Sequence, residues 1–217
     1  MATAAINPNT PYGLQPVQRL DGAAWTDRLR RYYVPQAQSN ALYVGDPVVK
    51  ITGSADVNGV NGVDLCSAGS TNRITGVVCG FLGTSTAGSG NTPSFYGLGT
   101  GPLYRPASTA VDWYVLVNDD PEAMWMIQAD ANYGASSGTA MPVTVVGKNI
   151  NLKSGTGSAY TGWSGWQADS NTTGTGATIQ LNIIDIYTDP VNKAVAQYQK
   201  LIVRNNISTE TNALAGI

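Results

Sequence analysis

The side chains that most often perform chemistry near neutral pH are scarce in this 217-residue chain, which contains no histidine. Histidine is the commonest general base and metal ligand in that pH range. Its absence excludes Ser–His–Asp and Cys–His catalysis and the usual zinc sites, whereas lysine- or carboxylate-based chemistry remains open. No segment has the glycine spacing of a phosphate-binding loop. The sequence therefore predicts no enzyme, no catalytic residue, no metal ligand and no cofactor.

The strongest acidic cluster consists of Asp119, Asp120 and Glu122, with Asp130 nearby. A hard cation such as Ca²⁺ accepts carboxylate oxygens of this kind, but the chain lacks the pattern of an EF-hand loop. The run Asn118-Asp-Asp-Pro between two apolar segments is also typical of a turn. The sequence favours a solvated turn here and leaves a cation site as the alternative.

Two further residue types could take part in chemistry. Cys66 and Cys79 lack metal-ligand spacing and could pair across a hairpin, although buried free thiols are favoured. Trp163 and Trp166 lie in the glycine-containing run Thr161-Gly-Trp-Ser-Gly-Trp. Tryptophans in such a polar run can stack on sugars, but they more commonly anchor a core or an interface.

The clearest basic segment contains Arg28, Arg30 and Arg31, followed by Tyr32 and Tyr33. Arginine and tyrosine together can bind phosphates and stack on bases. The same residues are enriched in protein interfaces, where arginine pairs with carboxylates. The formal net charge is −2 and the pI is about 4.9, which argues against a general nucleic-acid binder. A protein interface is the favoured interpretation.

Composition indicates a folded protein with a weakly charged surface. Hydrophobic residues make up 42% of the chain, but charged residues make up only 12%, about half the usual share of roughly 25%. Such a surface suits protein contact because little charge must be desolvated. We expect synthesis in the cytosol, because the N-terminus lacks signal-peptide features and no apolar run is long enough to span a membrane.

Residues 1–30 are predicted to form an extended N-terminal arm. Pro8, Pro11 and Pro16 disfavour regular structure, yet this segment is too apolar for a free tail. An arm laid on another molecule explains both facts, and an arm packed on its own domain is the alternative. The candidate interface residues in this region are Tyr12, Leu14, Trp25, Arg28, Arg30 and Arg31.

Residues 31–217 are predicted to form a single β-rich domain. Short apolar runs separated by turn residues, with period-2 alternation over 179–183, indicate many short strands. We expect a mainly β fold, either an antiparallel β-sandwich or a barrel, jelly-roll-like, with little helix. Residues 189–203 fit a helix, with a strand over 199–203 as the competing interpretation. The Gly/Ser/Thr-rich stretches near 83–101 and 153–178 are expected to be loops.

Several phrases of the sequence resemble small structural proteins from the head modules of tailed bacteriophages. The phrases are NTPYGLQP (9–16), LYVGDPV (42–48), NRITGVVCGF (72–81), LYRPASTA (103–110), YVLVNDDP (114–121) and GWQADS (165–170). Proteins of this kind are described as capsid cement, or decoration, proteins. The resemblance covers roughly residues 9–190 and includes no catalytic motif.

The resemblance implies a protein on the outer surface of the phage head in the virion, synthesised in the host cytoplasm. Its partners would be the major capsid protein and copies of itself, as a homodimer or homotrimer with the trimer slightly favoured. Neither nucleic acid nor membrane would be a partner. Such a protein would stabilise contacts between major capsid proteins. The alternatives are a glycan- or receptor-binding module of a phage tail, which would use Trp163 and Trp166, and a tail-tube or head–tail connector component.

Overall fold

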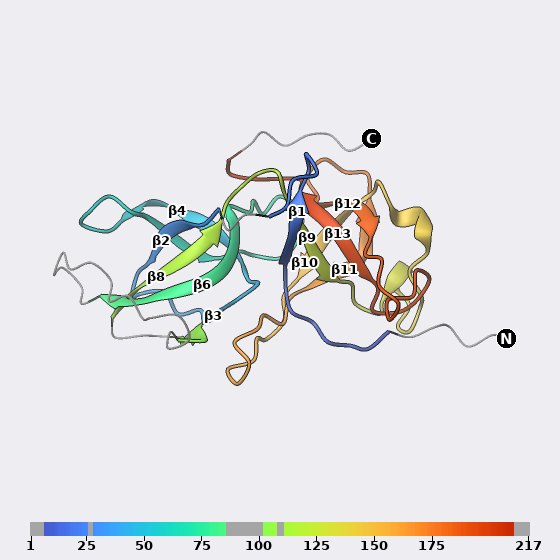
Figure 1. Ribbon diagram of the computed structural model, residues 1–217, viewed down its shortest axis with the longest axis horizontal. Helices are drawn as coiled ribbons and strands as arrows, with labels where there is room; N and C mark the ends of the chain where they lie inside the picture. The colour runs from blue at the N-terminus through green and yellow to red at the C-terminus, as the bar shows by residue number, and fades with distance from the viewer. Residues whose placement is uncertain (1–6, 26–27, 86–101, 108–110, 211–217) are drawn as a thin grey trace.

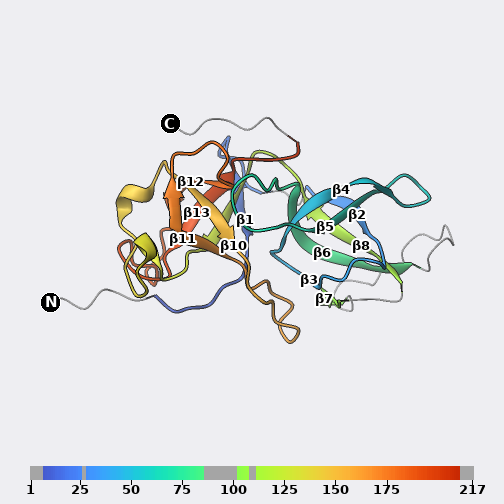
Figure 2. The ribbon, with the colours of Figure 1, turned by 180° about the vertical axis from the view of Figure 1, so that it is seen from behind.

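The computed structural model describes residues 7–25, 28–85, 102–107 and 111–210, and it confirms the prediction of a mainly β fold with little helix. Figures 1 and 2 show that the strands gather in two lobes, which lie side by side along the long axis of the molecule. One lobe contains a closed barrel and the other contains a six-stranded sheet. We call them the barrel lobe and the sheet lobe.

The barrel lobe consists of five strands in the order β2-β5-β4-β6-β8, which closes on itself. Neighbouring strands are antiparallel except β2 and β5, which run parallel where Tyr33 lies opposite Gly62. Closure leaves no open edge among these five strands to pair with another chain. Tyr32, Val48 and Val115 belong to the buried core of this lobe. The bounds are β2 (Arg30–Val34), β4 (Pro47–Ala55), β5 (Asn61–Leu65), β6 (Gly76–Ser85) and β8 (Asp112–Asn118).

The sheet lobe has the strand order β1-β9-β13-β12-β10-β11, and every neighbouring pair is antiparallel. The sheet curls until β11 meets the end of β9, where Ala129 and Ala168 form a parallel bridge. Trp125, Leu152 and Ile183 lie in the core that this curvature encloses. The bounds are β1 (Gln15–Arg19), β9 (Ala123–Gln128), β10 (Asn149–Lys153), β11 (Gln167–Gly174), β12 (Leu181–Ile186) and β13 (Lys200–Asn205).

The two lobes contact each other through apolar side chains. Ile74 and Val77, from the segment that leads into and begins β6, are fully buried in the core of the sheet lobe. The chain crosses between the lobes from β1 to β2 and, at residues 119–122, from β8 to β9. The strands of the predicted single β-rich domain therefore enclose two cores.

A small two-stranded sheet pairs β3 (Leu42–Tyr43) with β7 (Tyr104–Arg105). The rings of Tyr43 and Tyr104 stack with their centroids 5.1 Å apart. The fully buried Arg105 donates hydrogen bonds to the carbonyl oxygens of Asn40, Pro35 and Gln38, at 2.6, 3.1 and 2.9 Å. These bonds hold the link between β2 and β3 against β7.

The N-terminal segment packs on its own chain. Leu14 is fully buried in the core of the sheet lobe, and β1 pairs with β9 as an edge strand. Asn7 is buried and donates to the Asn192 side chain, while its own side-chain oxygen accepts the N–H of Lys193. Residues 7–19 therefore follow the alternative in which the segment packs on its own domain, and the arm expected to end at residue 30 contains a strand of the sheet lobe.

The helix considered for residues 189–203 is not formed, and β13 confirms the competing strand. The Asp189 carboxylate accepts the N–H of Val191, which begins a turn that does not continue. The Asn192 side chain instead hydrogen-bonds the carbonyl of Tyr187 and both backbone polar groups of Lys200, at 2.6–3.1 Å. An Asn side chain that satisfies backbone groups in this way competes with helix formation.

The loop expected over 153–178 is only partly a loop, because Gln167–Gly174 forms β11. The inward-facing Ala168 and Ser170 are fully buried. Their small or polar side chains lack the apolar alternation that usually identifies a strand. The other expected loop, 83–101, contributes residues 83–85 to β6, and its residues 86–101 lie outside the described residues.

The remaining elements are few. Two short 3₁₀ turns, η1 (Tyr133–Ala135) and η2 (Val143–Val145), are the helical segments of the described chain. None of the described residues form a helix long and apolar enough to cross a membrane. Cys66 and Cys79 do not form a disulfide with each other, and Cys66 is buried.

Candidate functional site

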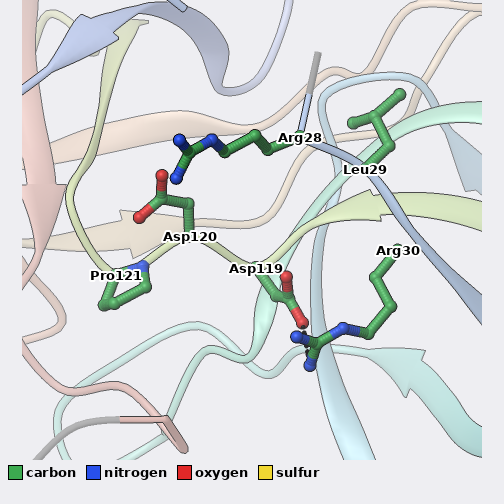
Figure 3. Close-up of a pocket in the computed structure, with 6 residues that line it drawn as sticks. All are labelled: Arg28, Leu29, Arg30, Asp119, Asp120 and Pro121. Carbon is green, nitrogen blue, oxygen red and sulfur yellow. Dashed lines mark ion pairs between the residues drawn. The ribbon is translucent and has the colours of Figure 1, made fainter. Parts of the chain in front are cut away.

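A cleft opens where the chain crosses between the two lobes. It has a volume of about 300 Å³, and we call it the arginine cleft. Figure 3 shows the ion pair between Arg30 and Asp119 on one side of it, and Arg28 on the side of Asp120. The lining residues are Arg28, Leu29, Arg30, Asp119, Asp120 and Pro121. Thus the basic segment found in the sequence lies against the acidic turn that was found separately.

The carboxylate of Asp119 is used within the fold. Its Oδ2 accepts hydrogen bonds from Arg30 at 2.8 Å and from the hydroxyl of Tyr32 at 2.7 Å. Burial and this hydrogen bond to Asp119 raise the pKa of the Tyr32 hydroxyl. The pKa of Arg30 is raised as well, first by its hydrogen bond with Tyr32 and then by the charge on Asp119. The raised pKa keeps the Tyr32 hydroxyl protonated near neutral pH, so Tyr32 remains the hydrogen-bond donor to Asp119.

The acidic turn is held by Arg19, which reaches it from β1. The Arg19 guanidinium pairs with Asp120 at 3.0 Å, Glu122 at 2.8 Å and Asp21 at 2.9 Å. The turn is confirmed, since the Asp120 carbonyl accepts the N–H of Ala123 and its carboxylate accepts the N–H of Glu122. Its solvation is only partial, because the side chains of Asp119 and Asp120 are 10% and 13% exposed. No three His, Cys, Asp or Glu side chains within the described ranges gather as a metal site would require.

Asp130, the fourth acidic residue, lies at the other end of β9 and closes the sheet lobe. Its buried carboxylate accepts hydrogen bonds from Lys153 Nζ at 2.6 Å and from both the N–H and the hydroxyl of Ser170. Burial alone would raise the pKa of Asp130, but these hydrogen bonds lower it below its usual value. The three polar side chains fasten β10 and β11 to the end of β9, which is a structural role.

The three arginines of the basic segment differ in their surroundings. Arg30 forms the ion pair with Asp119, although 63% of its side chain is exposed. Arg31 lies over the ring of Tyr114, 5.4 Å from its centroid. Arg28 is exposed and makes no ion pair or ring contact with any described residue. Of the three, Arg28 is therefore the arginine that remains fully available to a partner.

The other predicted interface residues lie elsewhere. Leu14 is fully buried in the core, so its side chain cannot contact a partner and its prediction as an interface residue is wrong. Trp25 is half-buried, and its indole N–H is buried without a hydrogen-bond partner within the described ranges. Tyr12 is half-buried and lines a second pocket.

This second pocket, which we call the aromatic groove, also has a volume of about 300 Å³. It lies between the N-terminal segment and the loop that joins β10 to β11. Figures 1 and 2 show that this loop projects from the sheet lobe beside β3. The lining residues are Pro11, Tyr12, Thr156, Ser158, Thr161, Trp163, Ser164 and Gly165. Trp163 is thus at a pocket, whereas Trp166 is 2% exposed and belongs to the core of the sheet lobe.

Four exposed valines lie on two segments at the end of the sheet lobe that faces away from the barrel. Two segments meet there through an antiparallel bridge between Met141 and Ala196, and both figures place these segments at the distal end of the lobe. We call this set the valine surface; it consists of Val143, Val146, Val191 and Val195. The sequence pattern did not predict this surface, because the helix expected over 189–203 would have turned Val191 and Val195 toward the core.

Comparison with protein-family models, curated proteins and solved structures finds no match to this chain.

Proposed function

We propose that the chain is a structural protein of a tailed-phage head, which binds the outer surface of the capsid shell and acts without catalysis. The phage context rests on the resemblance of the sequence phrases to capsid cement proteins. The mode of action rests on the valine surface. Its partners in this proposal are the major capsid protein and further copies of the chain.

The valine surface supports this proposal because four large apolar side chains are exposed on segments that meet. Val191 and Val195 are 61% and 53% exposed, on a loop that the polar contacts of Asn192 hold in place. Single exposed apolar residues are common, but a group on adjoining segments is typical of a contact site. Charged residues make up 12% of the chain, and an apolar contact here must leave the exposed Lys193, between Val191 and Val195, in solvent or paired.

The test is a change of charge on this surface. We expect the double variant Val191→Asp/Val195→Asp to bind isolated capsid shells at least about tenfold more weakly, because association would bury two unpaired carboxylates. Co-sedimentation of the purified protein with shells measures this binding. The matched control is Val57→Asp, since Val57 is 70% exposed on the turn between β4 and β5. The control variant should bind shells like the original protein.

Sedimentation equilibrium of the same variants separates the two partners. If the double variant loses both self-association and shell binding, the valine surface is assigned to contact between copies. If it loses shell binding alone, the surface is assigned to the shell. Unchanged behaviour of the double variant in both assays would remove the valine surface from the proposal. If the original protein does not bind isolated shells under any condition, the cement function itself is rejected.

Copy number distinguishes the proposed cement role from a connector or tail-tube role. A cement protein occupies equivalent positions over the whole shell, so it should be present in many copies per particle and distributed across the surface. A connector should form a single ring at one vertex. Quantitative gel densitometry of purified particles, scaled to the major capsid protein, measures this difference.

A further inference from the structure

The aromatic groove combines an apolar wall with hydroxyl groups, and none of the described residues that line it is charged. Tyr12, Pro11 and Trp163 form the apolar part, and Trp163 is 41% exposed. The hydroxyl groups come from Thr156, Ser158, Thr161 and Ser164. A pocket with an aromatic face and a few convergent polar groups is typical of small-ligand sites. Because these lining residues carry no charge, they offer nothing to balance a charged ligand.

The hydroxyl groups of the loop retain hydrogen-bond donors. The Ser158 oxygen accepts the N–H of Thr161 at 3.2 Å, and the Thr161 oxygen accepts the N–H of Trp163 at 3.4 Å. A hydroxyl that accepts a backbone N–H can still donate its own proton. Neither hydroxyl donates to any described residue, so both protons are available to an acceptor in the groove.

The groove is held in shape by backbone hydrogen bonds. Ser158 and Trp163 are joined by an N–H···O bond of 2.9 Å, and Val44 binds the loop on both sides of Trp163 at 3.0 and 2.9 Å. Gly162, with φ of +76°, packs against Leu103 where a Cβ would lie 2.6 Å from the Leu103 carbonyl oxygen. A site held in this way requires little ordering when a ligand binds.

We propose that the aromatic groove is a binding site for a neutral saccharide. A sugar ring has an apolar C–H face that stacks on Trp163 or Tyr12, and a rim of hydroxyl oxygens that accept from Ser158 and Thr161. The volume of about 300 Å³ lies at the lower end of small-ligand pockets, roughly 300–1,000 Å³, and suits a short oligosaccharide. This site is independent of the valine surface and of the proposed capsid role. Trp166, which the sequence paired with Trp163, contributes nothing to it because it is buried.

The test is binding of cellobiose, maltose, lactose and N,N′-diacetylchitobiose to the full chain, measured by saturation-transfer NMR and isothermal titration calorimetry. Sialyllactose is the charged comparison. We expect at least one neutral disaccharide to bind, and Trp163→Ala to weaken that binding by roughly tenfold or more. Trp163→Phe keeps an aromatic face and should retain part of the affinity. Ser158→Ala should weaken binding without altering the aromatic wall.

The matched control is Tyr160→Ala. Tyr160 is 92% exposed on the same loop but does not line the groove, so its removal should leave saccharide binding unchanged. Absence of binding by every neutral saccharide overturns the proposal, as does binding that Trp163→Ala and Ser158→Ala leave intact. Preference for sialyllactose, or for a proline-rich peptide tested beside the sugars, overturns the assigned ligand class.

Discussion

The arginine cleft and the aromatic groove have the same volume, about 300 Å³, and opposite chemistry. The cleft is lined by charged side chains, but Asp119 and Asp120 are already paired with Arg30 and Arg19. The groove is lined by uncharged residues, yet the hydroxyl protons of Ser158 and Thr161 are available. The density of functional groups around a pocket is therefore a poor guide to its ligand. What matters is which groups the fold has left without a partner.

The largest expected effect concerns the backbone beneath the groove. Gly13 has φ of +69°, and a Cβ there would lie 2.3 Å from the Gly45 carbonyl oxygen and 2.5 Å from Ser164. Gly13→Ala should therefore lower the free energy of unfolding by about 3 kcal/mol, through backbone strain and overlap. Urea denaturation measures this change.

Gly22→Ala is the control for Gly13→Ala. Gly22 has φ of +81°, but no atom lies within 4 Å of the place that a Cβ would take, so an alanine there would have the strain without the overlap. We expect a loss of about 1 kcal/mol. Equal losses in the two variants would show that the close packing beneath the groove contributes nothing to stability.

The next effect depends on pH and concerns Asp46, which follows Gly45 and is 2% exposed. Its carboxylate accepts the N–H of Tyr43 at 2.8 Å, and burial raises its pKa to about 6 from an ordinary value of 3.8. Because the folded pKa is raised, the neutral form is favoured in the folded state. The contribution of this group to stability is full below about pH 4 and is lost as the pH rises through 6.

Asp46→Asn should therefore stabilise the protein above pH 6, by up to about 3 kcal/mol, and should have little effect at pH 4. Asparagine keeps an oxygen that can accept the N–H of Tyr43. Thermal or urea unfolding of the variant and the original protein at pH 4, 5, 6 and 7 measures the difference. A difference that does not grow with pH would contradict the raised pKa.

A smaller effect is expected in the cleft. Asp119→Ala removes the acceptor for the buried Tyr32 hydroxyl and for Arg30, and we expect a loss of about 2 kcal/mol in the free energy of unfolding. The control Arg30→Ala removes only the largely exposed partner and should cost about 0.5 kcal/mol. If the two variants lose the same amount, the cleft is held by the exposed ion pair and the contrast with the groove weakens.

Much of the fold class was predictable from local pattern. The run Ile179–Ile183 alternates apolar and polar residues, and most of it lies in or beside β12. By contrast, β11 was missed because its buried residues are Ala168 and Ser170, and the apolar spacing at 191–195 indicated a helix that the side chain of Asn192 prevents. Apolar periodicity identifies a buried element only where large apolar side chains occupy the buried positions.

The sequence identified individual residues of both sites, but it did not show which of them lie together. Tyr12, Trp163 and the arginines were all recognised from residue type. That Tyr12 meets Trp163 across some 150 residues, and that Asp119 meets Arg30, depends on how the strands pair. Leu14 was misassigned to a surface because an apolar residue in a proline-rich segment has the same local pattern in a core and in an interface.

The sequence by itself determined the mainly β character, the absence of histidine chemistry and the weakly charged surface, because composition and short-range alternation express these directly. The tertiary structure decided which polar groups are used and which remain available. In the arginine cleft, strand pairing brings Asp119 to Arg30 and Asp120 to Arg19 within hydrogen-bond distance, and Arg28 is the lining charge that no described residue pairs. In the aromatic groove, backbone hydrogen bonds hold the loop around Trp163, and the hydroxyl protons of Ser158 and Thr161 have no acceptor among the described residues.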